Sequence, residues 1–238
     1  MRIKKEKCIA CKACHPYCPV GAISFVPWEN KQKSEVNQSG CVECGTCLRS
    51  GVCPMDAIFM PELEWPRKVR SHFSNPHAGH LPGKKGAMPP PEPKLNEVTG
   101  RISEEMTAVV VEAGRPGLSA SFHDVQEICM ALAKVGVAFD PGSPVTGLMV
   151  DPPMGRLRED ILNEKGLHVM IHFSSTNQHL LESLQALKEV SSRINTVFSI
   201  GLSNRLKDDG AIPTVSTAEE AGFTPRPHAK INTGLGRP

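Results

Sequence analysis

The sequence has few aromatic residues, little net charge and no long apolar run. Phenylalanine, tryptophan and tyrosine make up 5% of the 238 residues, and tyrosine occurs once. The formal net charge of +2 is too small to indicate nucleic acid as a partner. No apolar stretch approaches the roughly 18 to 20 residues that a membrane-spanning helix needs, so we expect no membrane span.

The start of the sequence also lacks the apolar run of a secretory signal peptide. It reads MRIKKEKC, in which charged residues dominate. We therefore predict a cytoplasmic protein in a reducing compartment, where disulfides are rare and thiols stay free. Proline and glycine are abundant, at 21 and 20 residues, and indicate a chain rich in loops.

Cysteine dominates what the sequence does contain. Two runs stand out, CIACKACHPYCP at 8–19 and CVECGTCLRSGVCP at 41–54. The first has the spacing C-x2-C-x2-C-x3-C-P, which is typical of chains that hold two [4Fe-4S] clusters and in which the fourth cysteine binds the other run's cluster. Three thiolates on one tight loop can reach three corners of a cube, and a distant fourth completes it. We therefore assign cluster I to Cys8, Cys11, Cys14 and Cys53, and cluster II to Cys41, Cys44, Cys47 and Cys18.

The two runs form an internal repeat with one irregularity. Their first three cysteines are 33 residues apart, whereas their last cysteines are 35 apart, so two residues are inserted within LRSGV. The repeat predicts a pseudo-twofold domain in which each half gives one ligand to the other half's cluster. We expect the insertion to bulge between Cys47 and Cys53 and to bring Arg49 or Ser50 near sulfur. It should make the reduction potentials of the two clusters unequal.

Zinc and disulfide bonds are the alternative uses of these cysteines. Paired C-x2-C motifs also bind structural zinc, but two C-P endings and an exchanged fourth ligand fit zinc poorly. Disulfides conflict with the predicted reducing compartment. His15 lies between two ligands but is not needed for either set, and Tyr17 is expected to shield a cluster from water. The ninth cysteine, Cys129, is expected in a hydrophobic core.

Three segments are predicted. Residues 1–60 hold few large apolar side chains, so metal–thiolate bonds should supply much of their stability. Residues 61–105 carry eight prolines between Pro61 and Pro93 and are predicted to be a proline-rich basic linker or docking segment. Its histidines at 72, 77 and 80 are expected at solvent or at an interface. Residues 106–238 are predicted to be an α/β plait domain with a C-terminal extension.

The third segment alternates strand and helix patterns. Runs rich in β-branched residues predict strands at 107–113, 167–173 and 196–202, and a strand interrupted by Pro and Gly at 137–150. Apolar residues at helical spacing predict one helix after Ser121 and another after 174–176. The order β-α-β-β-α-β is typical of the ferredoxin-like plait, whose two helices cover one face of an antiparallel sheet. The fold class is therefore α+β. His168 and His172 are expected on a solvated or partner-covered face of their strand.

Residues 1–60 closely resemble two-[4Fe-4S] bacterial ferredoxins, through eight cysteines and both C-P endings. The motifs CVECGTCLRSGVCP, ELEWPR, NEVTGR and EAGRPG also resemble the iron–sulfur portion of 6-hydroxynicotinate reductase-like proteins. That second resemblance implies reduction of a nitrogen heteroaromatic ring with iron–sulfur and flavin centres. The sequence ends without a recognisable flavin domain, so a separate flavin-bearing or catalytic subunit is implied.

We predict a non-catalytic electron-transfer subunit of an anaerobic reductase or oxidoreductase complex. It would relay single electrons through two clusters to or from a catalytic partner, while the plait docks or dimerises. The sequence shows no nucleophile–base pair or carboxylate dyad that would indicate catalysis. Two alternatives stay open. The plait could be a regulatory module that binds a small ligand near Glu112, Arg115 and the GRPG turn, or the chain could itself be the reductase, with Arg67, Lys68 and Arg70 on a substrate carboxylate.

Overall fold

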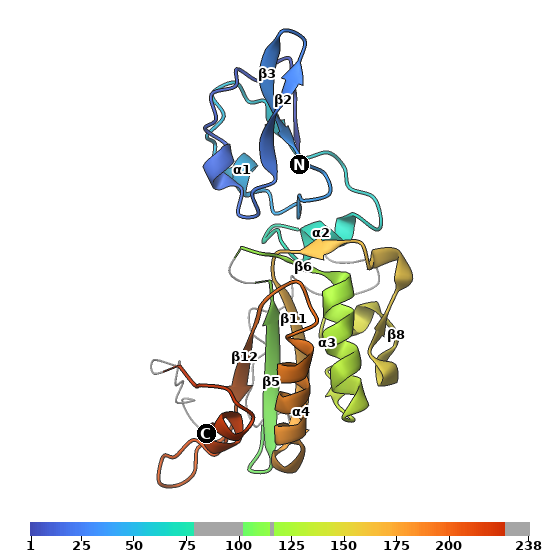
Figure 1. Cartoon of the computed structure of the whole chain (residues 1–238), viewed down its shortest axis with the longest axis vertical. Helices are drawn as coiled ribbons and strands as arrows, with labels where there is room; N and C mark the ends of the chain where they lie inside the picture. The colour runs from blue at the N-terminus through green and yellow to red at the C-terminus, as the bar shows by residue number, and fades with distance from the viewer. Residues whose placement is uncertain (79–101, 115–116, 227–238) are drawn as a thin grey trace. The chain divides into compact units, whose positions relative to one another are not determined.

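The computed structural model describes residues 1–78, 102–114 and 117–226, and these contain both helices and strands (Figure 1). They divide into two compact units. Within the described ranges, the first unit comprises Met1–Met88, Gly114–Phe122 and Glu159–Val169, and the second comprises Pro89–Ala113, His123–Arg158 and Met170–Pro238. Two stretches of the predicted third segment thus group with the cysteine-rich part of the chain. The boundaries at 60 and 105 stay a prediction.

The core of the first unit is small and is built partly from cysteines. Strand β1 (Arg2–Ile3) pairs antiparallel with β4 (Ile58–Phe59), which joins the two ends of the repeat. The short helices η1 (His15–Tyr17) and α1 (Thr46–Arg49) occupy the two cysteine runs. The buried cluster between these elements consists of Met1, Cys14, Ala22, Ile23, Val36, Cys41, Cys47 and Ile58. With so little apolar surface buried, the thiols are part of the core itself.

A β-hairpin connects the two cysteine runs. Strand β2 (Ile23–Trp28) pairs antiparallel with β3 (Lys31–Val36), from Ile23 opposite Val36 to Trp28 opposite Lys31. The two-residue turn between the strands begins at Glu29, which has the left-handed φ of 52° that tight hairpin turns require. Ser34 of β3 is buried and faces the first cysteine run, because it lines the same cavity as Cys8 and Cys14.

Helix α2 (Lys68–His72) and a two-stranded ribbon complete the first unit. The ribbon pairs β6 (Ala120–Ser121) with β10 (Lys165–Gly166). Phe73 follows α2 and packs edge-on against Phe122, with 5.2 Å between the ring centroids. The η5 turn (Glu159–Ile161) precedes β10, and Trp65 donates from its ring nitrogen to Asp160 at 2.6 Å. The beginning of the predicted linker is therefore a packed part of this unit.

The second unit contains a four-stranded sheet in the order β12-β5-β11-β7. Its members are β5 (Met106–Ala113), β7 (Ala138–Phe139), β11 (Val169–Thr176) and β12 (Phe198–Ser203). Strand β12 runs antiparallel to β5, from Phe198 opposite Ala113 to Ser203 opposite Ala108, and β11 runs antiparallel to β7. The three strands predicted at 107–113, 167–173 and 196–202 are therefore present. Most of their observed ends lie within one or two residues of the predicted ends.

Two amphipathic helices accompany this sheet, α3 (Phe122–Lys134) and α4 (Asn177–Val190). The side chain of Thr176 caps α4 by accepting from the backbone N–H of His179 at 3.4 Å. Cys129 is fully buried in α3, as expected of a core thiol. Buried aliphatic residues recur at helical spacing and include Val125, Ile128 and Leu132 in α3 and Leu180, Leu184, Leu187 and Val190 in α4. A short helix, α5 (Val215–Glu220), follows β12.

Two expectations for this unit are wrong. In the predicted strand at 137–150 only β7 joins the sheet, because residues Thr146–Leu148 form the η3 turn. Next, β8 (Met149–Asp151) pairs with β9 (Arg156–Leu157) around the η4 turn (Pro152–Met154). His172 is buried rather than solvated, since β11 buries both of its faces over residues 171–173. Among the described residues no helix is long and apolar enough to cross a membrane.

Candidate metal centres

The first predicted ligand set surrounds one cavity. Cys8, Cys11, Cys14 and Cys53 all line it, although Cys53 lies 39 residues beyond Cys14 in the sequence. Apolar atoms of Ile3, Ile9, Ala13, Ala57 and Ile58 make up most of the remaining wall of this cavity. The fold thus brings the distant fourth cysteine to the other three in the grouping assigned to cluster I.

The second predicted set is also brought together. Burial, together with the charges of Cys44, Cys18 and Cys41, raises the pKa of the Cys47 thiol to about 12. These three cysteines are therefore electrostatic neighbours of Cys47, as the grouping assigned to cluster II requires. Burial also raises the pKa of Cys14 in the first set and of Cys41 in the second.

The backbone around the first three cysteines repeats from one run to the other. Ala10 and Lys12 have left-handed φ values of 58° and 66°, and their counterparts 33 residues on, Glu43 and Gly45, have 56° and 73°. In both runs the residue two positions after the first cysteine donates its backbone N–H to the sulfur of that cysteine. Ala10 donates to Cys8 and Glu43 donates to Cys41, each at 3.4 Å. Such left-handed bends turn successive N–H groups inward, which favours anions and metal–sulfur groups.

The fourth cysteines show the same repeat with the longer offset. Ala22 donates its N–H to Cys18 Sγ at 3.1 Å, and Ala57, 35 residues later, donates to Cys53 Sγ at 3.2 Å. Gly21 and Asp56, which precede these donors, both have left-handed φ, at 61° and 45°. The sulfur atoms of the fourth cysteines thus accept equivalent backbone hydrogen bonds in the two halves. Residues other than glycine adopt the left-handed φ at a cost of about 1–2 kcal/mol each.

These residues fit [4Fe-4S] clusters. All nine cysteines are free of disulfides, so the eight in the runs are available as thiols. No three histidine, cysteine, aspartate or glutamate side chains among the described residues converge on a point suited to a single ion. A cube does not require convergence, because each cysteine binds a different iron at its own corner. Buried thiols with raised pKa values give up their protons when a metal binds.

Side chains of the inserted loop donate hydrogen bonds to the backbone carbonyl oxygens of two cysteines assigned to cluster II. Arg49 donates to the carbonyl of Cys44 and to the side chain of Asn75, both at 2.8 Å. Ser50 donates to the carbonyl of Cys47 at 2.9 Å, and Gly51 has a left-handed φ of 63°. Arg49 and Ser50 thus reach the carbonyls of cluster II ligands, and their proximity to sulfur stays a prediction.

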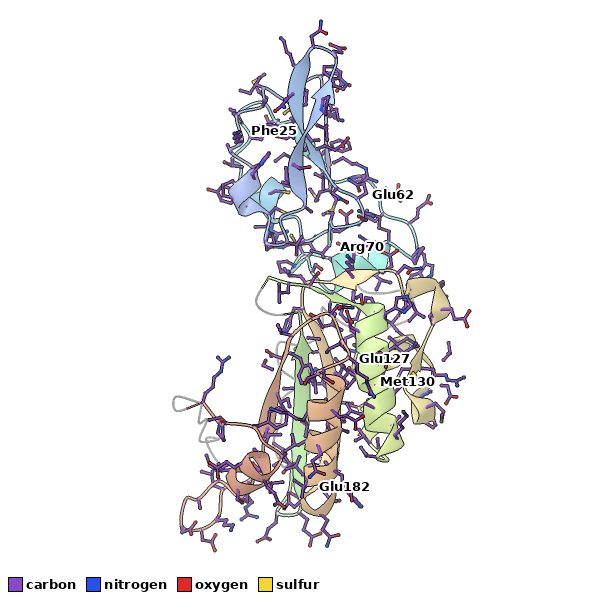
Figure 2. The ribbon with its side chains drawn as sticks, viewed as in Figure 1. Phe25, Glu62, Arg70, Glu127, Met130 and Glu182 are labelled. Atoms are coloured by element: carbon purple, nitrogen blue, oxygen red, sulfur yellow. The ribbon has the colours of Figure 1, made fainter. Side chains whose placement is uncertain are left out.

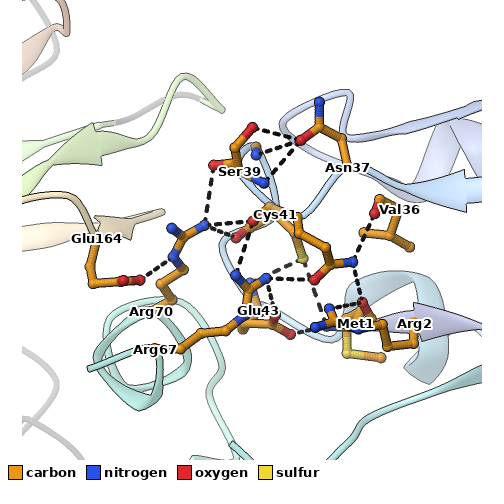
Figure 3. Close-up of polar contacts among 12 residues, drawn as sticks. Met1, Arg2, Val36, Asn37, Ser39, Cys41, Glu43, Arg67, Arg70 and Glu164 are labelled. Atoms are coloured by element: carbon orange, nitrogen blue, oxygen red, sulfur yellow. Dashed lines mark hydrogen bonds and ion pairs between the residues drawn. The ribbon is translucent and has the colours of Figure 1, made fainter. Parts of the chain in front are cut away.

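A buried ionic network beside Cys41 was not predicted from the sequence (Figure 3). The Glu43 carboxylate is buried and pairs with the Met1 ammonium and with Arg67, whose Nε lies 2.7 Å from Oε1. Burial alone would raise the pKa of Glu43, but the hydrogen bonds and charges of Met1 and Arg67 outweigh it and hold that pKa below 4.5. The only sequence signal for this network was the basic stretch beside a cysteine-rich domain.

Arg70 fixes the loop that precedes Cys41. From α2, where it is labelled in Figure 2, its Nη1 donates to the carbonyls of Gln38 at 3.0 Å, Ser39 at 3.1 Å and Cys41 at 2.8 Å, while its Nε pairs with Glu164. Arg67 also donates to the backbone and side chain of Gln38. Both guanidinium groups therefore bind the loop that precedes Cys41. Of the three cations proposed to contact a substrate carboxylate, Lys68 is the exposed one.

The remaining candidate residues have other surroundings. His15 contacts Ser34 Oγ at 3.0 Å through Nε2 and stacks at a tilt on Phe25, so its ring faces the hairpin. Tyr17 is 44% exposed. His72 packs edge-on against Phe73, and His77 is exposed. His80 and Arg115 lie outside the described residues.

Comparison with known proteins identifies one family model and several relatives of this chain. The family model described as a 4Fe-4S dicluster domain matches residues 1–60. A ferredoxin of Rickettsia felis is 30% identical over 92 residues, which cover 37% of this chain and 79% of that protein. An uncharacterised ferredoxin of Methanocaldococcus jannaschii is 32% identical over 66 residues, which cover 28% of this chain and 82% of that protein.

A third relative is a larger protein that matches over a short stretch. It is a subunit of an ion-translocating oxidoreductase complex from Methanosarcina acetivorans, and it is 39% identical over 51 residues, or 21% of this chain and 17% of its own length. No solved structure matches the chain significantly. None of these proteins bears on the resemblance to 6-hydroxynicotinate reductase-like proteins, which stays a prediction. From its cysteine-rich part, the chain belongs to the ferredoxin family of iron–sulfur electron-transfer proteins, with a 4Fe-4S ferredoxin-type domain at residues 1–60.

Proposed function

We propose that this chain relays single electrons through two [4Fe-4S] clusters, to or from a catalytic partner in an oxidoreductase complex. The observation that carries the proposal is the repeated cradle: two sets of four cysteines, each with its fourth member from the other run and each with the same pattern of N–H donors. When bound, the clusters would supply one-electron oxidation and reduction. The partner would be a flavin- or metal-containing subunit.

The protein's own residues would hold the clusters and set their surroundings. Cys8, Cys11, Cys14 and Cys53 would bind cluster I, and Cys41, Cys44, Cys47 and Cys18 would bind cluster II. Backbone N–H groups directed at sulfur stabilise negative charge there, and burial disfavours it, so these two effects are the levers on the reduction potential. Thr46 adds a hydroxyl 3.3 Å from Cys44 Sγ, which has no counterpart in the first run.

A partner protein is supported by one relative and by the second unit. The relative from Methanosarcina acetivorans is by its name one component of an ion-translocating oxidoreductase complex, and it matches this chain over 51 residues. The second unit fits the β-α-β-β-α-β plait, since its first and third strands, β5 and β11, are central in the order β12-β5-β11-β7. We propose that this unit docks the chain to its partner or to a second copy.

Metal analysis of the full chain, purified without oxygen, tests the proposal. The protein should contain about eight iron and eight sulfide per chain, and its visible absorbance should fall in part as each cluster takes up one electron. Removal of the iron with a chelator should unfold the first unit, because metal–thiolate bonds replace an apolar core there. Stoichiometric zinc without sulfide would refute the proposal, as would turnover of an organic substrate by the isolated chain at its full rate.

A further inference from the structure

The two cysteine sets differ in their access to the surface. In the first set Cys11 is exposed, and its neighbour Ile9, which lines the same cavity, is 57% exposed. In the second set Cys41, Cys44 and Cys47 are all buried, as is Gly45 between them. Electron transfer between proteins requires close approach, so the first set is the better placed of the two to meet a partner.

Three lysines of the segment 4–12 and one of the hairpin lie near this exposed position. Lys12 lines the cavity of the first set, and its ammonium lies 5.3 Å from the centre of the Phe25 ring. Lys33, from the hairpin, donates to the carbonyl of Cys8, and Lys4 lies 5.3 Å from the centre of the Phe59 ring. Lys7 immediately precedes Cys8 and is exposed. We refer to these residues around Ile9 and Cys11, namely Lys4, Lys7, Lys12 and Lys33, as the lysine face.

Acidic residues near the lysine face do not cancel its charge. Glu35 pairs with Lys5 at 2.6 Å, so this pair contributes no net charge. Glu6, which precedes Lys7, and Asp56, which lies just before β4, are both exposed. The four lysines of the lysine face are therefore accompanied by two carboxylates, four positive charges against two negative ones. Because the whole chain has a net charge of only +2, the positive charge here is a local feature. An exposed apolar residue with charged residues beside it is compatible with a docking patch, whose rim is polar and solvent-accessible.

We propose that the lysine face is the docking surface for a redox protein that presents an acidic surface. The inference rests on the proposed electron-transfer function and names the kind of partner and the place where it binds. Opposite charges steer such partners together and orient them before contact, which raises the association rate more than the final affinity. Docking forms and breaks no covalent bond. The transfer it serves moves one electron, so one protein is oxidised as the other is reduced.

Two redox proteins of opposite charge serve as probes, a strongly acidic flavodoxin and a basic cytochrome c. Calorimetry with the iron-loaded full chain should detect flavodoxin binding at about 20 mM salt and a large loss of it at about 300 mM, where the Debye length has fallen to about 6 Å. Cytochrome c should not bind under either condition. Binding is measured without electron transfer, so this readout does not depend on cluster potentials.

Charge reversal locates the surface. Lys7→Glu combined with Lys12→Glu should weaken flavodoxin binding at least about tenfold at low salt, and Lys7→Glu alone should weaken it less. Lys68→Glu is the matched control, because it changes the net charge equally per site and places a glutamate in the first turn of α2, where an acidic residue is favourable. It should leave flavodoxin binding within about twofold of the original.

The outcomes separate this inference from the function on which it rests. A chain without iron and sulfide would refute the proposed function. An iron-loaded chain that binds cytochrome c more tightly than flavodoxin, or binds flavodoxin equally well after Lys7→Glu, would overturn the docking surface alone. Lysine-dependent binding of single-stranded RNA or of phosphatidylserine vesicles without flavodoxin binding would also overturn it, since it would assign the lysine face to another class of partner.

Discussion

At the scale of single residues, the cysteines depend on neighbours held in an unfavourable backbone conformation. Ala10, Lys12 and Glu43 have left-handed φ values although none is glycine. A side chain at such a position costs about 1–2 kcal/mol, and the N–H···S bonds of Ala10 and Glu43 help to offset it. The donor is a backbone group, so no side-chain motif announces it in the sequence.

Ala10→Gly should therefore stabilise the iron-loaded protein. Glycine adopts a left-handed φ without steric cost and keeps the N–H that faces Cys8, so the apparent free energy of unfolding should rise by about 1 kcal/mol. Anaerobic denaturant titration, followed by visible absorbance, measures the change. Ala13→Gly is the control, since Ala13 does not have a positive φ and the substitution should destabilise instead. Destabilisation by Ala10→Gly would contradict this account of the loop.

Glu43→Gln should destabilise the first unit in a pH-dependent way. The amide leaves Arg67 and the Met1 ammonium without their buried countercharge, which should cost about 3–5 kcal/mol at pH 7. Although burial opposes this, the Met1 ammonium and Arg67 lower the pKa of Glu43 in the folded protein, so its carboxylate contributes fully above the pKa of the unfolded chain and loses its contribution as pH falls through the folded pKa. Denaturation midpoints of the two proteins should therefore differ most near neutral pH and converge as the pH falls through the lowered pKa of Glu43. A constant difference down to pH 3 would contradict the assignment.

At the scale of elements, α2 holds the second cysteine run in place. Arg70 uses one guanidinium to contact three carbonyls of the 38–41 loop and the Glu164 carboxylate. A lysine has one compact ammonium and cannot reproduce this fork. Arg70→Lys should therefore lower the unfolding free energy by about 2–4 kcal/mol. Lys68→Ala, an exposed change in the same helix, should cost under about 0.5 kcal/mol. Equal midpoints for the two variants in a thermal scan would contradict the role of Arg70.

The inserted loop is the second element with a predictable effect. Ser50 bonds the Cys47 carbonyl, and Gly51 ends α1 with a left-handed turn, so deletion of both residues removes contacts that the first run does not have. We expect the deletion to shift at least one of two reduction midpoints in a redox titration followed by electron paramagnetic resonance. Two unshifted midpoints would show that the insertion does not distinguish the clusters.

Periodic patterns predicted the elements of the second unit better than its connections. The apolar stripes of α3 and α4 are buried at Ile128, Leu132, Leu184 and Leu187, because helical spacing alone determines which positions share a face. The run at 144–150 was misassigned, since its apolar residues lie at the η3 turn and in the β8–β9 hairpin rather than in the sheet. Whether a short apolar run pairs locally or joins a distant strand depends on tertiary contacts that its pattern does not contain.

At the scale of the whole molecule, the cysteine spacing predicted which cysteines lie together, but not the network that supports them. Cys53 lines the cavity of the first run and Cys18 neighbours Cys47, as the exchanged spacing requires. The network of Glu43, Arg67 and Arg70 could not be predicted, because its partners are separated by 24 to 94 residues and no short motif joins them. For the same reason the sequence did not indicate that 114–122 and 159–169 group with the cysteine-rich part.

The central claim is that two clusters share their ligands across the repeat, and single cysteine-to-serine variants test it most directly. Electron paramagnetic resonance of the reduced protein should show that Cys18→Ser alters the same cluster signal as Cys44→Ser. Cys53→Ser should alter the same signal as Cys11→Ser, and the two pairs should differ from each other. If Cys18→Ser instead matches Cys11→Ser, or if the unaltered protein holds a single cluster, the account is wrong.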